Sequence, residues 1–71
     1  MPLDGRVARE TEIISSSPKS FDDAVQVGFK RASRTLRGIT GIKVGDWRCK
    51  VENGTIVQYR VTLKVLFVLE T

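Results

Sequence analysis

Apolar and polar residues alternate from Val57 to Val65, and the apolar positions of this series continue to Leu69. Every second residue from Val57 to Leu69 is apolar. The polar residues that stand between them are Gln58, Arg60, Thr62 and Lys64. A period of two is that of a β-strand with one buried and one solvated face, so this segment predicts a long strand. A chain that carries such a strand needs at least one more strand to pair with it and another layer to cover its apolar face.

A turn and a second strand precede this segment. The run Glu52-Asn53-Gly54 predicts a tight hairpin, because Asn-Gly accepts the positive φ angles that such a turn requires. Residues 39–51 predict the second strand. Their apolar alternation changes phase after Gly45, which predicts a bulge or a sharp bend there.

A helix is predicted over residues 20–37. Ser20 is followed by Asp23 at the spacing of a capping box, and Gly38 is a typical residue to end the helix. Asp22 and Asp23 fall in the first turn, where the helix dipole favours carboxylates, so we interpret them as structural. Apolar or small residues recur at intervals of three and four, at Phe21, Ala24, Val25, Gly28, Phe29, Ala32 and Leu36.

A short first strand is predicted over residues 8–16, closed by the turn-forming run Ser15-Ser16-Ser17-Pro18. Residues 1–8 show no periodicity and are interpreted as a loose tail, which leaves residues 9–71 as one domain. The predicted fold class is α+β, with the order β-α-β-β and a three-stranded antiparallel sheet packed on one helix.

The predicted core is small for an independent domain. A chain of 71 residues buries a modest share of its surface, and its core supplies only a few kcal/mol. One cysteine, Cys49, rules out an intramolecular disulfide, and we expect it to be a buried, inert thiol. Leu66 and Val68 make both faces of the third strand apolar near its end. One helix cannot cover both faces, so we predict a homo-oligomer.

Composition argues against several classes of function. The chain has no histidine, so the common catalytic triads and zinc sites cannot form, and we expect no enzyme and no metal site. Twelve Lys and Arg against eight Asp and Glu give a net charge of +4, which favours anionic partners. Nucleic acid is not expected to be one of them, because the polar face of the third strand carries no aromatic residue on which bases would stack.

The apolar runs are too short for a membrane. The longest, residues 65–69, is far below the about 18 residues that a span needs, and residues 1–9 lack the apolar core of a signal peptide. We therefore expect a cytoplasmic protein without membrane contacts.

Three segments resemble the dodecin family: the run Ser15-Ser16-Ser17-Pro18, residues 31–37 (RASRTLR) and residues 59–70 (YRVTLKVLFVLE). The resemblance covers residues 9–70 and is without a gap from Thr35 to Phe67. Dodecins are small flavin-binding proteins that assemble as hollow homododecamers. The resemblance therefore implies a shell of twelve copies and a non-catalytic role in storing a flavin such as FMN or riboflavin.

The resemblance also implies where a flavin would bind. Gly41 stands where the family has a tryptophan that stacks on the flavin ring, and Arg60 stands where it has a glutamine that hydrogen-bonds that ring. Arg48 matches a basic position that lies near the phosphate of a flavin nucleotide in some members. Two residues of the family's pocket are thus changed. The alternative function is a dodecin-like shell without flavin, with a structural role or with a cation or another small ligand bound.

Each candidate residue also has a structural interpretation. Trp47 either replaces the missing stacking group or packs within the fold or against another subunit; about 20 Å of strand separates it from Gly41. Arg60 and Arg48 either contact a flat anionic ligand or form salt bridges on the polar face. Asp46 and Glu52, repeated by symmetry, are the weaker candidates for a cation site.

Overall fold

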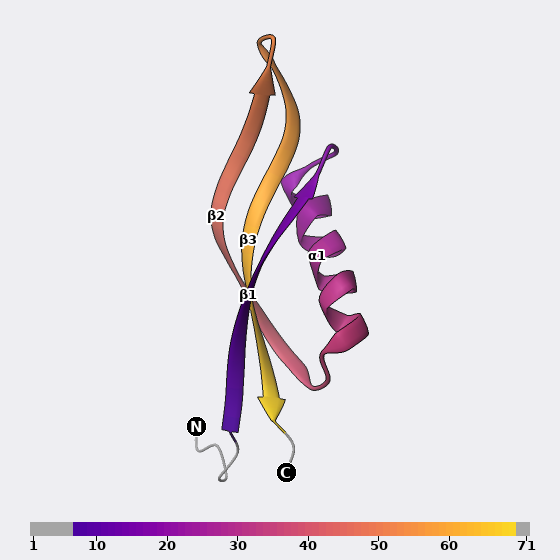
Figure 1. Cartoon of the computed structure of the whole chain (residues 1–71), viewed down its shortest axis with the longest axis vertical. Coiled ribbons are helices and arrows are strands. Elements are labelled where there is room, and N and C mark those ends of the chain that lie inside the picture. The colour runs from indigo at the N-terminus through magenta and orange to yellow at the C-terminus, as the bar shows by residue number, and fades with distance from the viewer. Residues whose placement is uncertain (1–6, 70–71) are drawn as a thin grey trace.

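The computed structural model describes residues 7–69, which form three strands and one helix (Figure 1). They run in the order β1 (Val7–Ser17), α1 (Phe21–Thr35), β2 (Ile39–Glu52) and β3 (Thr55–Leu69). The strands form one antiparallel sheet in the order β1-β3-β2. This arrangement confirms the predicted fold class. β3, which contains the alternating segment, lies in the centre of the sheet, where it pairs with both neighbours.

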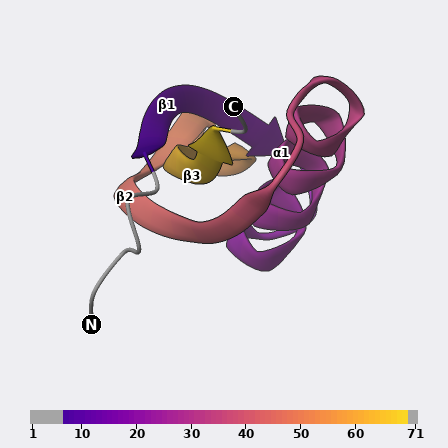
Figure 2. The ribbon, with the colours of Figure 1, turned by 90° about the horizontal axis from the view of Figure 1, so that it is seen from below.

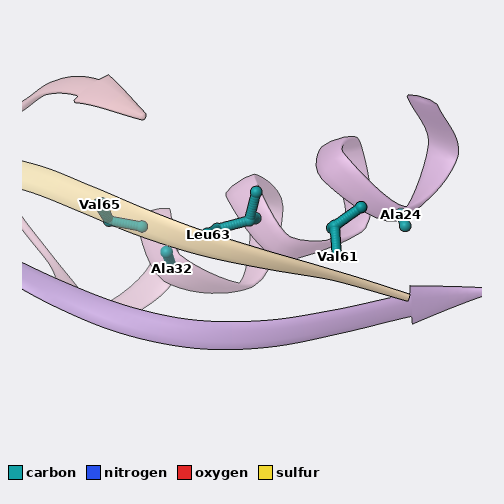
Figure 3. Close-up of a cluster of buried hydrophobic side chains, with 5 residues drawn as sticks. All are labelled: Ala24, Ala32, Val61, Leu63 and Val65. Carbon is teal, nitrogen blue, oxygen red and sulfur yellow. The ribbon is translucent and has the colours of Figure 1, made fainter. Parts of the chain in front are cut away.

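The helix covers one face of the sheet and the other face is left open (Figure 2). Val61, Leu63 and Val65 of β3 are fully buried against Ala24 and Ala32 of α1 (Figure 3). Small helix residues let the two layers approach closely. A Cβ atom at Gly28 would lie only 2.5 Å from Cδ1 of Leu63. The helix is therefore held close to the centre of β3.

The sheet is longer than the helix that covers it. Fifteen residues of α1 span about 22 Å, whereas the fifteen residues of β3 span about 50 Å. The β2–β3 hairpin consequently extends past the helix (Figure 1). Val57 and Leu69, near the two ends of the alternating series, are 36% and 38% exposed although the pattern predicts a buried face. A single helix thus leaves apolar surface at both ends of the sheet.

The helix starts at the predicted place and ends earlier than predicted. Ser20 is the N-cap, and its Oγ accepts a hydrogen bond of 2.9 Å from the backbone N–H of Asp23. The last helical residue is Thr35, so the prediction of Arg37 is wrong. Leu36 is already extended, with ψ at 139°, and packs against the core, while Gly38 turns the chain with φ at +72°. Burial of Leu36 thus ends the helix before the glycine is reached.

The hairpin and the bulge agree with their predictions. Asn53 and Gly54 both have positive φ, at 52° and 75°, as a tight hairpin turn requires. The pairing of β2 with β3 shifts between Val44 and Trp47, which confirms the irregularity predicted near Gly45. Two further shifts, at residues 39–41 and 50–51, have no counterpart in the sequence pattern.

The first strand differs most from its prediction. β1 has eleven residues and pairs with β3 along its whole length, so the prediction of a short strand is wrong. It includes Val7 and Ala8, which were assigned to the tail; the other tail residues, 1–6, lie outside the described residues. Within the described part, α1 is too short and too polar to cross a membrane.

Candidate functional site

Three of the four candidate residues lie on the face of the sheet that the helix leaves open. The buried residues of β3 have odd numbers and face α1, so its even-numbered residues face the other way. Arg60 is one of these, and the register places Arg48 of β2 directly opposite it. Gly41 pairs with Leu66, which also lies on this face. We call this surface the open face.

Trp47 lies on the opposite side of the sheet from the other three candidates. It pairs with the buried Val61, and its ring packs edge-on against Phe21 with 4.9 Å between the centroids. Phe21 makes a second edge contact of 5.1 Å with Tyr59. Trp47 is 57% exposed, so one part of the indole packs and the rest faces solvent. Within one chain the structure supports packing for Trp47, because its ring cannot reach the open face.

The open face separates Gly41 from Arg60. Their positions on β3 are those of Leu66 and Arg60, which are six residues apart, or about 20 Å. A flavin ring spans far less than this distance. A pocket that contains both positions must therefore combine Gly41 of one copy with Arg60 of another. Within one chain, only Arg48 and Arg60 are neighbours.

The two arginines are exposed and incompletely paired with carboxylates. Arg60 donates a hydrogen bond from Nη2 to Oε1 of Gln58 at 3.1 Å, and the structure shows no ion pair for it within residues 7–69. Arg48 lies 3.8 Å from Asp46 through its Nη2, with both side chains 72% exposed. Such an exposed pair contributes little to stability. The cross-strand salt bridge considered for Arg48 is not formed, because its neighbour has the same charge.

Gly41 leaves free space on the open face. A Cβ atom built on it would have Cδ2 of Leu66 as its nearest neighbour, at 4.0 Å, which is an ordinary contact. A Cβ atom can therefore be added here without displacing the backbone. The same position could also receive a flat ligand, which is the use that the resemblance implied.

The remaining chemical candidates are accounted for by local structure. Asp23 accepts a hydrogen bond of 2.6 Å from Oγ of Ser17 and lies in the first turn of α1, in agreement with its structural interpretation. Cys49 is exposed, so the expectation of a buried thiol is wrong; it lies in the part of β2 that the helix does not cover. Among the described residues, no three Asp, Glu or Cys side chains gather as metal ligands would.

Comparisons with known proteins agree with this architecture. The family model described as Dodecin matches residues 7–70. A curated dodecin from Thermus thermophilus is 30% identical over 66 residues, which cover 93% of this chain and 96% of the relative. The solved structure of dodecin from Streptomyces coelicolor has 35% identity and a TM-score of 0.93, and the match covers 97% of this chain and 99% of that one.

The description of a more distant relative names calcium as its ligand. This is a calcium dodecin from Mycobacterium tuberculosis, described as calcium chelating and as having a novel calcium-binding site. It is 26% identical, with a TM-score of 0.80 over 90% of this chain and 91% of the other. Sequence, family model and fold therefore agree: the chain belongs to the dodecin family, whose members are non-catalytic and typically assemble into dodecamers.

Proposed function

We propose that this dodecin binds and stores a flavin, FMN or riboflavin, in a homododecamer that performs no catalysis. The observation that carries the proposal is the exposed pair Arg48 and Arg60, which lie directly opposite each other on the open face. Gly41 provides free space on the same face of the sheet. Together they offer positive charge and room, which a flat anionic ligand requires.

Arginine suits such a ligand in two ways. Its planar guanidinium lies flat against aromatic rings, and it pairs with phosphate oxygens through two parallel hydrogen bonds. Arg60 is positioned by its hydrogen bond to Gln58, so its charge is held on the open face. We assign Arg60 to contact with the flavin ring or its phosphate, and Arg48 to the phosphate.

The dimensions of the chain support an assembly. The molecule measures 52 × 23 × 14 Å, and its apolar ends are not covered by its own helix. Exposed apolar residues on different elements, among them Val7, Ile14, Val51 and Ile56, would be buried by other copies. Because Gly41 and Arg60 are about 20 Å apart in one chain, the proposed pocket also requires neighbouring copies.

A fluorescence titration tests this function. Riboflavin and FMN are added to the purified protein, and the mass of the assembly is measured by light scattering on the same sample. We expect a dodecamer that quenches flavin fluorescence, because a ring stacked in a pocket loses its emission. A dodecamer that leaves the fluorescence unchanged would contradict flavin binding, and a monomer would contradict the assembly.

A double substitution tests the place of the site. Gly41→Trp with Arg60→Gln introduces the two residues that the family has at these positions. A Cβ atom at position 41 meets no close contact, so the tryptophan can begin there without moving the backbone. Stacking on the tryptophan contributes about 1 to 3 kcal/mol, and the glutamine keeps a hydrogen-bond donor in place of Arg60. We therefore expect a net gain, with riboflavin bound about tenfold tighter. A correctly assembled variant without tighter binding would show that the site lies elsewhere.

The alternative is a shell that holds a cation. It is favoured by the description of the M. tuberculosis relative as a calcium dodecin. Asp46 and Glu52 are the acidic residues of β2, and calcium prefers such oxygen ligands, so symmetry copies would have to complete the site. Calcium should then raise the melting temperature, and Asp46→Asn with Glu52→Gln should abolish this shift. A melting temperature unaffected by calcium excludes this alternative.

A further inference from the structure

Two pairs of like charges lie across the β2–β3 ladder on the open face. Lys43 is directly opposite Lys64, and Arg48 is directly opposite Arg60. Side chains opposite each other in an antiparallel sheet are about 4.5 to 5.5 Å apart at Cβ, and like charges at this spacing destabilise the sheet. All four residues are exposed. We call these four residues the cation strip.

Carboxylates near the cation strip offset only part of its charge. Glu12 of β1 pairs with Lys64 on its other side, and Asp46 lies 3.8 Å from Arg48. Arg60 has Ser16 on its β1 side, which adds a hydroxyl and no charge. Glu10 of β1, opposite Leu66, is a third carboxylate on the same face. Four cations against these three carboxylates leave one positive charge on this part of the face. The carboxylates are themselves exposed, and exposed ion pairs are weak. These carboxylates therefore hold the four cations only loosely.

The surface between the two pairs is hollow. Gly45 and Asp46 form the bulge opposite Thr62, and they line a depression of about 340 Å³ together with Glu12, Lys43 and Lys64. A glycine in the bulge adds no side chain to fill this space. Lys64 and Arg60 are four residues apart on β3, so the two pairs are separated by about 13 Å. The depression thus has Lys43 and Lys64 at one end, and Arg48 lies two positions beyond Asp46, outside its lining, opposite Arg60.

We propose that the cation strip binds an oligophosphate, a ligand with several linked phosphate groups that extends from Lys43 and Lys64 to Arg48 and Arg60. Such a ligand relieves the repulsion within both pairs at once, and a single phosphate reaches only one of them. The site goes beyond flavin binding, since Lys43 and Lys64 have no part in the proposed flavin pocket. It shares Arg48 and Arg60 with that pocket, so oligophosphate competes with FMN.

Calorimetric titration of tripolyphosphate and orthophosphate at low salt tests this site. We compare the wild-type protein with Lys43→Glu, which places a carboxylate opposite Lys64. The matched control is Lys30→Glu, which makes the same charge change at an exposed position of α1. Tripolyphosphate should bind the wild type at least about tenfold tighter than orthophosphate does. Lys43→Glu should weaken tripolyphosphate about tenfold, and the control about twofold or less.

Several results would overturn the proposal. Equal losses of tripolyphosphate affinity in Lys43→Glu and Lys30→Glu would show that only net charge matters. Equal affinities of the wild type for tripolyphosphate and orthophosphate would show that the two cation pairs do not act together. No detectable tripolyphosphate binding would also exclude the site. Circular dichroism and light scattering confirm that each variant is folded and assembled. Lys43→Gln, which only removes the charge, is the second variant should Lys43→Glu fail to assemble.

The test separates this site from the flavin function because tripolyphosphate has no ring. Binding of tripolyphosphate without any flavin quenching would support the cation strip and contradict the proposed flavin store. Flavin quenching without tripolyphosphate binding would support the flavin store and contradict the oligophosphate site on the cation strip.

Discussion

Gly28 lies at the closest approach between the helix and the sheet, and replacing it with alanine tests how tightly the layers pack. The new Cβ atom would lie 2.5 Å from Cδ1 of Leu63 and 2.9 Å from Cβ of Ser15. Carbon atoms in contact are about 3.5 to 4.0 Å apart, so the neighbours would have to move by about 0.6 to 1.0 Å. Leu63 can rotate, but the Cβ of Ser15 moves only with the backbone of β1.

Three effects set the magnitude for Gly28→Ala. Alanine favours the helix over glycine by about 1 kcal/mol. Overpacking of a core costs about 1 to 3 kcal/mol. Separating the layers also weakens the hydrogen bond of 2.6 Å that Ser15 donates from Oγ to the carbonyl of Ala24, which contributes about 1 kcal/mol. We therefore expect a net loss of about 1 to 3 kcal/mol in the free energy of unfolding.

The assay is urea unfolding at one fixed protein concentration, because assembly makes stability depend on concentration. Gly41→Ala is the matched control, since its Cβ would have the ordinary separation of 4.0 Å from Leu66. Leu63→Val removes the Cδ1 atom, so in the Gly28→Ala background it should cost less than in the wild type. If Gly28→Ala instead raised the free energy of unfolding by about 1 kcal/mol, the helix-propensity gain of alanine, this account of the packing would be refuted.

Three smaller predictions concern single contacts. Ser20→Ala removes the N-cap bond to Asp23 and should cost about 1 kcal/mol in urea unfolding, and an unchanged midpoint would contradict the cap. Gly54→Ala places a side chain at a φ of +75° and should cost about 1 to 2 kcal/mol by the same measurement; full stability would mean that the turn changes type. Phe21→Leu removes the edge contact with Trp47, should cost about 0.5 to 1.5 kcal/mol in urea unfolding and should shift the tryptophan emission to the red. An unshifted spectrum would contradict this contact.

Local patterns were sufficient to predict most of the fold. Apolar residues at every second position of residues 57–69 predicted β3, Asn53-Gly54 predicted the hairpin, and Ser20 predicted the start of α1. Each of these features depends on a few neighbouring residues, so one sequence contains the necessary information. The predictions of the helix end and of the length of β1 were wrong for the opposite reason. Both depend on contacts with β3, which the local sequence does not contain.

The candidate site was predicted less completely than the fold. Gly41, Arg48 and Arg60 were found by resemblance, and they do share one face of the sheet. Trp47 does not join them, because the bulge between Val44 and Trp47 changes which residues of β2 face the helix. The lysine pair of the cation strip was missed altogether. Its signal, two lysines twenty-one positions apart, has no meaning until the register of the strands is known.

The amino-acid sequence alone thus specified the secondary-structure elements, their order, the small size of the core and the positive net charge. The alternation and the turn residues specify local structure through a few neighbouring positions, and the net charge is the sum over all charged residues. The central place of β3, the approach at Gly28 and the meeting of Lys43 with Lys64 and of Arg48 with Arg60 depended on the folded sheet. Bulges shift the pairing by single residues, and a shift of one residue moves a side chain to the other face. Register is therefore a property of the strands in contact, and the open face exists only when they pair.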